Sequence, residues 1–365
     1  MIYFDSGATT LQKPPAVAEA FRYAMAHFAS PGRGGHAPAM AAADAVYACR
    51  EKAAALFDAQ PEQIVFTMNA THALNIAIRT LVRPGDRVVI SGFEHNAVTR
   101  PLHYLGAKTA VAGTRLFDPA DTLEAFSRLL TPETKAAVCT HVSNVFGYIL
   151  PLAQIAALCR ARGVPLIVDA SQSAGILPVS LRGLGAAFIA MPGHKGLYGP
   201  QGTGMLVCGR MPDPLMQGGS GSQSALAEMP DFLPDASEAG THNVSGIHAL
   251  AAGLDFVQSL GLGTILHHEA HLRRLLARGL REIPGALCFT GGAQSGVVSF
   301  LYGAEDCEQT AQRLCESGIA VRAGLHCAPL AHRSAGTAQS GTVRVSFSVF
   351  NREEEVAAFL CAVKK

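Results

Sequence analysis

One lysine lies in a setting that suits covalent chemistry with an aldehyde. Lys195 stands within the glycine-rich segment MPGHKGLYGPQG at 191–202, directly after an apolar run that predicts a buried strand. Partial desolvation lowers the pKa of a lysine, so its neutral amine becomes able to form a Schiff base. The segment fits neither GxxxxGK[ST] nor a GxGxxG motif that opens a helix after a strand. Taken alone, it is also compatible with an ordinary turn and a surface lysine.

A second segment places an acid at the end of another apolar run. Asp169 closes LIVD at 166–169, and Gln172 follows three residues later. A carboxylate in this position can pair with the protonated pyridine nitrogen of pyridoxal phosphate (PLP) and keep the ring electron-withdrawing. A helix cap or a metal ligand is the alternative for an isolated Asp at a strand end.

A third segment carries a candidate thiol nucleophile. Cys327 follows His326 in RAGLHCAPLAH at 322–332. A neighbouring imidazole and guanidinium can favour the thiolate, and a loop can carry it to a substrate. A structural thiol is the alternative, because the chain has nine cysteines and no CxxC pair. This odd, unpaired set predicts reduced thiols.

The elements that must position these residues follow from the apolar pattern. Short β-rich runs alternate with amphipathic helical stretches, which is typical of a layered α/β domain with a mainly parallel sheet. Ligands bind beyond the carboxyl ends of the strands in such sheets, so polar residues just after each strand are candidates for a site. The predicted strands are 64–67, 87–91, 136–141, 165–169, 187–191 and 205–208.

The remainder of the chain predicts a smaller α/β domain. A Gly/Ser/Pro-rich region at 218–234 precedes a helical stretch at 247–280, strand-like runs at 296–301, 319–322 and 342–348, and a last helix at 353–363. The loop at 218–227 is expected to be mobile. We therefore expect a large domain at 15–260 and a small domain at 261–365, with 1–14 packing near the small one.

Composition excludes several classes of partner. Lys plus Arg (29) nearly balance Asp plus Glu (28), so no global field would attract nucleic acid or a membrane surface. No run reaches the roughly 18 apolar residues of a membrane span, and no signal segment is evident. These features predict a cytoplasmic protein that acts on a small molecule.

His267 and His271 lie one helical turn apart but not in the HExxH order, so no metal site is predicted.

Taken together, the three segments resemble the class V aminotransferase family of fold-type I PLP enzymes, and within it the group II cysteine desulfurases and selenocysteine lyases. The resemblance covers nearly the whole chain, from YFDSGATT at 3–10 through RGGH at 33–36 to TVRVSFS at 342–348. It implies a PLP-dependent transferase fold, with a mainly parallel sheet in a three-layer large domain and a smaller C-terminal α/β domain.

The resemblance also implies a role for each matching residue around the cofactor. Lys195 would hold PLP and move the proton at the substrate α-carbon, and Asp169 would pair with the pyridine nitrogen. Gln172 would contact the phenolic oxygen, and His95 would stack on the ring and act in acid–base steps, although a core histidine is the alternative for His95. The phosphate would lie at the start of a helix, where N–H groups and the dipole favour an anion, among Thr71, His72 and His194.

Substrate and partner residues follow in the same way. Arg344 would pair with the carboxylate of L-cysteine, Arg322 would support it, and Asn144 would lie beside the substrate. Cys327 would take the sulfur as a persulfide, leaving L-alanine, and pass it to an acceptor protein or a small thiol. Thr241 resembles the threonine that reaches the phosphate of a neighbouring subunit, which implies a homodimer.

One departure and two alternatives accompany this interpretation. Pro192 stands where many relatives carry a phosphate-binding Ser or Thr, and it offers neither a hydroxyl nor an N–H. A selenocysteine lyase or another β-elimination enzyme would keep the PLP residues and need Cys327 less. A PLP-binding protein without turnover is the alternative of another class.

Overall fold

The computed structural model describes residues 1–32 and 34–364. Arg33, the first residue of the RGGH segment, lies outside the described residues.

A seven-stranded sheet forms the centre of the larger part of the molecule. Strands β3 to β7 are parallel neighbours, whereas β8 runs antiparallel between β7 and β2, so the predicted mainly parallel sheet is confirmed. The apolar strands are buried because helices cover both faces. In sheet order the strands are β2 (Ile64–Thr67), β8 (Gly204–Cys208), β7 (Phe188–Pro192), β6 (Leu166–Asp169), β5 (Thr134–Thr140), β3 (Arg87–Ser91) and β4 (Lys108–Ala112).

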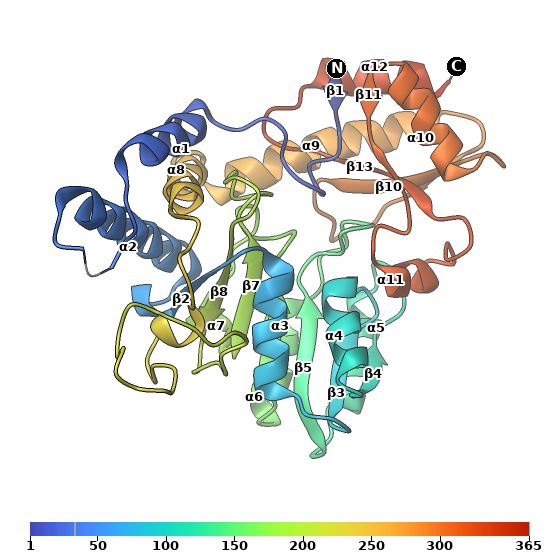
Figure 1. Ribbon diagram of the computed structural model, residues 1–365. Coiled ribbons are helices and arrows are strands. Elements are labelled where there is room, and N and C mark those ends of the chain that lie inside the picture. The colour runs from blue at the N-terminus through green and yellow to red at the C-terminus, as the bar shows by residue number, and fades with distance from the viewer. Residues whose placement is uncertain (33, 365) are drawn as a thin grey trace.

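Helices on both faces of this sheet complete three layers (Figure 1). On one face, α3 (Ala70–Leu81) and α4 (Asn96–Tyr104) pack through one apolar cluster that includes Leu74, Val88 and Val98. A second cluster lies on the other face and contains side chains of α2 (Ala37–Phe57), α5 (Pro119–Leu129), α6 (Leu152–Ala161), α7 (Leu181–Leu184) and α8 (Val244–Leu260). Helix α1 (Pro15–His27) packs beside α8.

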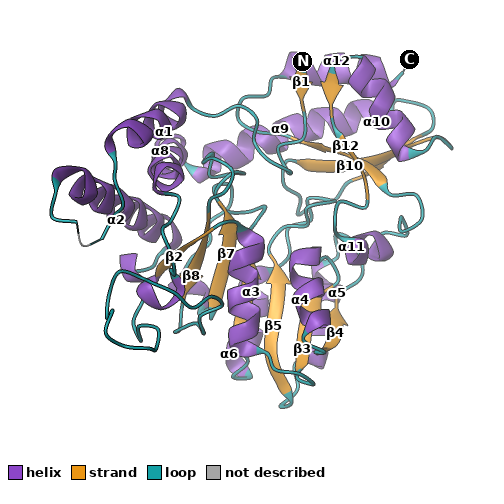
Figure 2. Cartoon of the chain, viewed as in Figure 1, coloured by secondary structure: helices purple, strands orange, loops and turns teal. Residues whose placement is uncertain are grey.

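A second, smaller sheet has its own core. Its strands are antiparallel in the order β12 (Arg322–Gly324), β13 (Thr342–Ser346), β10 (Val297–Tyr302) and β9 (Ala286–Phe289). Helices α9 (Leu262–Arg281), α10 (Cys307–Glu316) and α12 (Glu353–Val363) accompany it (Figure 2). The core includes Leu276, Phe300 and Phe359, and it also takes Phe4 from the other end of the chain. The expected fold class, a three-layer α/β domain with a smaller α/β domain, is therefore confirmed.

The N-terminal strand belongs to this smaller part of the molecule. Strand β1 (Ile2–Tyr3) pairs in parallel with β11 (Ile319–Ala320). Helix α11 (Pro329–Ser334) follows the loop that carries Cys327. The division of the chain into domains at residue 260 stays a prediction.

The sequence pattern was wrong in three places. The single helical stretch at 247–280 is two helices bent by 80°, because Gly261 between them adopts a φ of 78°. The run at 319–322 is divided between β11 and β12, which belong to different sheets. Strands β1, β4 and β9 were not predicted, since each lies at a sheet edge and exposes part of its side chains.

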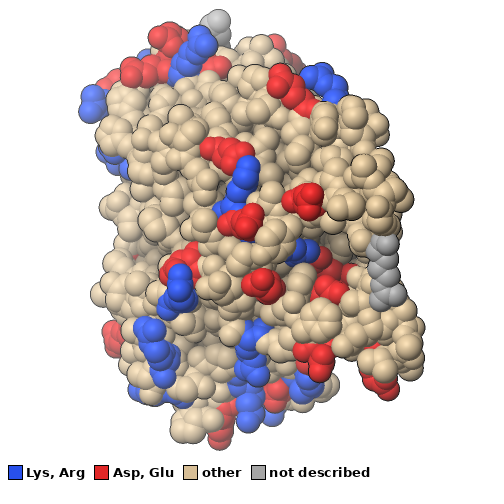
Figure 3. All heavy atoms as spheres, turned by 90° about the vertical axis from the view of Figure 1, so that its left-hand side faces the viewer, with Lys and Arg blue, Asp and Glu red and all other residues tan. Residues whose placement is uncertain are grey.

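Two further observations concern the surface and the helices. On the face shown in Figure 3, charges of both signs are scattered among uncharged residues. Among the described residues no single helix is long and apolar enough to span a membrane, and only the bent pair α8–α9 meets that test when both helices are counted together.

Candidate active site

A cavity of about 190 Å³ lies where β5, β6 and β7 end. Asp169 is the last residue of β6, and it pairs in register with Thr140 of β5 and Ala190 of β7. Lys195 follows β7 by three residues. The structure therefore brings together the following predicted residues in the lining of one cavity: Thr71, His95, Asn144, Asp169, Gln172, His194 and Lys195.

Lys195 is held in a tight turn. Gly199 N–H donates to the Gly193 carbonyl at 2.8 Å, and Gly193 N–H donates to the Thr203 carbonyl at 2.8 Å. A Cβ on Gly193 would lie only 2.2 Å from Thr203 Oγ1, so this turn requires glycine. Burial, aided by the nearby Arg344 cation and opposed by Asp169, lowers the pKa of Lys195 to about 8. At pH 7 roughly a tenth of the amine is thus neutral and nucleophilic, far more than for an exposed lysine.

Asp169 and His95 face the same cavity with defined hydrogen bonds. Asp169 is 3% exposed, and its Oδ1 accepts from Ser171 N–H at 2.9 Å. His95 caps α4, with Nδ1 accepting from Ala97 N–H at 3.0 Å. Burial lowers the pKa of His95. A neutral His95 ring with Nδ1 as acceptor carries its proton on Nε2, which makes that nitrogen a hydrogen-bond donor.

The start of helix α3, which also lines the cavity, suits a phosphate. Helix α3 begins at Ala70, and the N–H groups of a first helical turn have no intrahelical partner. Asn69 Oδ1 accepts from His72 N–H at 2.9 Å, and Thr71 lines the cavity. His194 Nδ1 is buried and has no partner among the described residues. These donors fit the phosphate of PLP, while Asp169 and Lys195 fit its ring nitrogen and aldehyde.

Two predicted phosphate ligands lie elsewhere in the isolated chain. The His72 side chain is not among the residues that line this cavity, and its Nδ1 accepts from Met68 N–H at 3.3 Å. Thr241 is exposed and lines a separate cavity with Arg50 and Glu238. Pro192 does line the site, at the end of β7.

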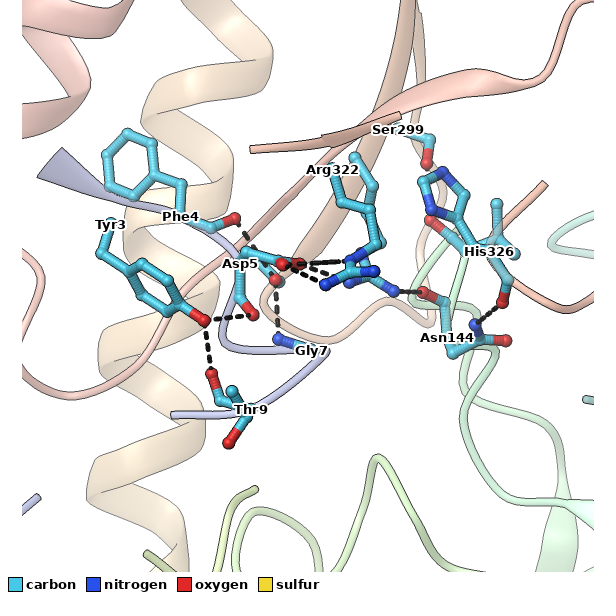
Figure 4. A network of polar contacts seen from close by, with 12 residues as sticks. Tyr3, Phe4, Asp5, Gly7, Thr9, Asn144, Ser299, Arg322 and His326 are labelled. Carbon is cyan, nitrogen blue, oxygen red and sulfur yellow. Dashed lines mark hydrogen bonds and ion pairs between the residues drawn. The ribbon is translucent and has the colours of Figure 1, made fainter. Parts of the chain in front are cut away.

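Asp5 joins the two predicted substrate arginines, Arg344 and Arg322. Figure 4 shows Asp5 beside Arg322. Asp5 Oδ1 accepts from Arg344 Nη2 at 2.6 Å, and its Oδ2 lies 2.9 Å from Arg322 Nη2. Arg344 is 2% exposed and also donates from Nη1 to the Asn144 carbonyl at 3.0 Å. Gly7 lies against this group, because a Cβ there would be 3.3 Å from Arg344 Cζ. The guanidinium of Arg344 is therefore fixed in position beside the cavity.

Gln172 and Asn144 hold neighbouring backbone in place. Gln172 Nε2 donates to the Gly7 carbonyl at 2.8 Å. Asn144 Nδ2 donates to the His326 carbonyl at 2.8 Å, which ties the cavity to the loop before α11.

Cys327 lies at the mouth of the site. All nine cysteines are free, and Cys327 is exposed and lines a second hollow together with His95 and Thr71. His326 and Cys327 both adopt left-handed backbone, with φ of 48° and 55°. Asn96 N–H donates to the Cys327 carbonyl at 2.7 Å. An exposed thiol is thus presented next to the residues that face Lys195.

Sequence reasoning missed three contributors to this arrangement. Asp5 was noticed only as part of a segment, and its partners lie more than 300 residues away. Glu94 was only one of the polar residues that follow a strand, yet it is fully buried, and its Oε1 accepts from Ser91 Oγ and from Thr140 N–H. Lys13 Nζ donates to the His194 carbonyl at 3.0 Å, and burial lowers the pKa of Lys13 to about 8. Its one signal was its position just after the YFDSGATT segment.

The histidine-rich part of α9 forms no metal centre in the structure. His271 Nε2 lies 2.8 Å from Glu353 Oε1, and His268 Nε2 lies 3.0 Å from the Asn351 carbonyl. Within residues 1–32 and 34–364, no three His, Cys, Asp or Glu side chains are grouped as a metal site requires.

The lysine at a strand end, in a cavity of a layered α/β fold, marks a candidate active site, and comparisons with known proteins identify the family of the chain. The profile of the aminotransferase class-V family matches residues 2–359. The probable cysteine desulfurase of Methanothermobacter thermautotrophicus is 34% identical over 378 residues, which cover 97% of this chain and 92% of that protein. The probable cysteine desulfurase of Mycolicibacterium paratuberculosis is also 34% identical, and the chain spans 55% of its length.

A solved structure gives the same result in three dimensions. The apo structure of a cysteine desulfurase from Thermococcus onnurineus superimposes with a TM-score of 0.91 at 32% identity, covering 100% of this chain and 94% of that one. This chain belongs to the aminotransferase class-V family.

Proposed function

We propose that this protein is a PLP-dependent cysteine desulfurase, which converts L-cysteine to L-alanine and takes the sulfur onto Cys327. The observation that carries the proposal is the convergence of Lys195, Asp169 and His95 in one cavity with an exposed Cys327 at its mouth. Full-length relatives named as cysteine desulfurases support it.

The geometry of the cavity supports a role for each proposed cofactor residue. When bound, PLP supplies an aldehyde and a cationic ring that withdraws electrons from the substrate α-carbon. Lys195 would hold the aldehyde end, and Asp169 would keep a proton on the ring nitrogen. Because the pKa of Lys195 is lowered to about 8, its released amine can accept and return a proton at the α-carbon. His95 would stack on the ring, and the start of α3 with Thr71 and His194 would bind the phosphate.

Arg344 would bind the substrate carboxylate. A planar guanidinium suits bidentate pairing with a carboxylate, and Arg344 is already fixed by Asp5 and Asn144. Arg322 also pairs with Asp5, so it would hold the Asp5 carboxylate in place against Arg344. Asn144 would lie beside the bound amino acid.

Cys327 would perform the sulfur transfer. Its thiolate attacks the substrate sulfur, a new S–S bond forms, and the Cβ–S bond breaks with its electron pair going to Cβ, which takes up a proton. The products are L-alanine and a persulfide on Cys327, without an external oxidant. A thiol acceptor, either a small molecule or a partner protein, would then remove the outer sulfur.

Further parts of the proposal concern assembly and place. A homodimer would let the exposed Thr241 of one subunit reach the phosphate site of the other. The free thiols fit a reducing compartment, as a cytoplasmic protein requires.

The decisive experiment treats PLP-saturated protein with borohydride and maps the modified residue by mass spectrometry. A pyridoxyl group on Lys195, absent in Lys195→Ala, is the expected result. A protein that takes up no cofactor at this residue would refute the proposal.

A second measurement tests the thiol. With L-cysteine as substrate, Cys327→Ala should form alanine at least about 100-fold more slowly and form no persulfide at position 327, because the nucleophile is lost. Cys315→Ala is the matched control, since Cys315 is also exposed but lies on α10. If Cys327→Ala keeps full activity with L-selenocysteine or L-cysteine, a lyase of the same fold is the better description.

A further inference from the structure

Four arginines gather on one side of helix α9. Arg274, Arg278 and Arg281 are spaced i, i+4 and i+7, so they share a helix face, and Arg273 borders it. With Thr290 and Gly291 from the loop after β9, they line a cavity of about 500 Å³. None of these residues lines the cavity around Lys195. The cavity is therefore a separate feature of the small domain.

Arg273 distinguishes this cavity from an ordinary solvated helix face. Its side chain is 9% exposed, its Nη1 donates to Gln294 Oε1 at 3.1 Å, and its Nε is buried without a partner among the described residues. Burying a guanidinium that no anion neutralises costs free energy. Burial, together with the nearby cations Arg274 and Arg281, lowers the pKa of Arg273. An anion in the cavity would relieve this cost.

The protein itself supplies little compensating charge. In the described part of the chain, none of the four arginines lies within 4.0 Å of an Asp or Glu oxygen. Glu282 is the single acidic residue in the lining. Four guanidinium groups thus face one carboxylate.

The helix dipole explains only part of the cluster. Cations in the last turn of a helix interact favourably with its C-terminal end, and Arg278 and Arg281 lie there. Arg273 and Arg274 lie about two turns earlier, beyond the range of that effect.

The wall opposite α9 is fixed in place. Gln294 is 4% exposed, and its Oε1 accepts from Gly291 N–H at 3.1 Å as well as from Arg273. Its Nε2 donates to the Phe146 carbonyl at 2.9 Å. Arg281 Nη2 donates to Thr290 Oγ1 at 2.6 Å. These bonds tie the loop to the helix, so the cavity is formed before any ligand binds.

We propose that this cavity binds a small anion with two or more phosphate groups, such as inorganic pyrophosphate or a nucleoside triphosphate. Planar guanidinium groups match phosphate oxygens bidentately. Arg274 and Arg281 are separated by about 10 Å along the helix, at 1.5 Å per residue. A single phosphate is too small to span this row, whereas two or three linked phosphates reach it.

The test is calorimetric titration of the full protein, saturated with PLP so that the cofactor phosphate already fills the catalytic cavity. Pyrophosphate, ATP and sulfate are titrated separately to distinguish an inorganic ligand from a nucleotide. Pyrophosphate or ATP should bind, and sulfate should bind at least about tenfold more weakly because it contacts fewer guanidinium groups.

The matched variants remove two exposed arginines each. Arg274→Gln with Arg278→Gln should weaken binding at least about tenfold, since each removes a charge-assisted hydrogen bond. Arg128→Gln with Arg160→Gln removes the same charge from α5 and α6 and should leave affinity within about twofold. Equal weakening in both pairs, no binding of either phosphate compound, or equally tight binding of sulfate would overturn the proposal.

Discussion

At the scale of residues, Asp5 holds two cations with one carboxylate. Arg344 is almost completely buried, whereas Arg322 is half exposed on the outer side of the same carboxylate. Arg344 is therefore the partner that depends most on Asp5, because water cannot replace a lost counter-charge there.

We predict that Asp5→Asn lowers the free energy of unfolding by about 3 kcal/mol, since it leaves a buried guanidinium unpaired. Urea denaturation of the PLP-free protein measures this. Asp255→Asn is the control, because the Lys52–Asp255 pair is largely exposed, and it should cost less than about 1 kcal/mol. A similar decrease in the free energy of unfolding in both variants would show that the buried pair stabilises the protein no more than the exposed pair does.

Glu94 is the second residue whose burial has a measurable consequence. Burial raises the pKa of Glu94 from 4.5 to about 8, against the opposing hydrogen bonds from Ser91 and Thr140. Between these two pH values the folded protein binds one proton more than the unfolded chain. The free energy of unfolding therefore falls as pH rises through this range.

Glu94→Gln should remove that fall. The free energy of unfolding of Glu94→Gln, relative to that of the wild type, should increase between pH 4.5 and about 8, by on the order of 5 kcal/mol at the upper end. Denaturant titrations at several pH values in this range provide the comparison. Glu124→Gln, at an exposed position on α5, should follow the wild type throughout. Parallel curves for all three proteins would contradict the prediction.

At the scale of elements, apolar runs predicted most strands of the large sheet because those strands are buried on both faces. Edge strand β4 exposes most of its side chains, and edge strand β9 is apolar but only four residues long and partly exposed. A helix break at one glycine leaves the helical periodicity on either side unchanged. Strand ends likewise predicted Lys195, Asp169 and Asn144 as neighbours in the site. The Asp5–Arg344 pair could not be predicted, since no local pattern reports a contact between residues so far apart in sequence.

Gly261 tests whether the break between α8 and α9 depends on backbone conformation. Gly261→Ala should destabilise the protein by about 1 kcal/mol, because φ of 78° is unfavourable for a residue with Cβ, although open space surrounds the position. Gly263→Ala has equal space but lies inside α9 without a positive φ, and it should stabilise by about 0.5 kcal/mol. Thermal unfolding of both variants measures these changes in stability. A change of the same sign in both variants would contradict the prediction.

At the scale of the whole molecule, the proposed homodimer gives Thr241 a function that the single chain does not. Within one chain, Thr241 lines a cavity of about 710 Å³ that shares none of its lining residues with the Lys195 site. A catalytic site completed by two subunits makes complementation between defective subunits a direct test.

Co-expression of Lys195→Ala and Thr241→Ala subunits should restore activity at a PLP concentration too low to saturate the Thr241→Ala dimer, where neither variant is active alone. Half of the randomly assembled dimers are mixed, and each has one intact site, so about a quarter of wild-type specific activity is expected. Alanine formation from L-cysteine is the measurement. If purified mixed dimers showed no recovery of activity, Thr241 would not contribute to the phosphate site of the partner subunit.

The pairing of Asp5 with Arg344 also implies an order of folding during translation. Translation releases a chain from its N-terminus, and domains fold as they emerge. Every strand of the seven-stranded sheet lies between residues 64 and 208. All strands of this sheet are therefore synthesised before Arg344, the buried partner of Asp5. The anchor for the amino acid carboxylate is therefore completed last, and a nascent chain stalled before residue 344 would have a folded sheet without it.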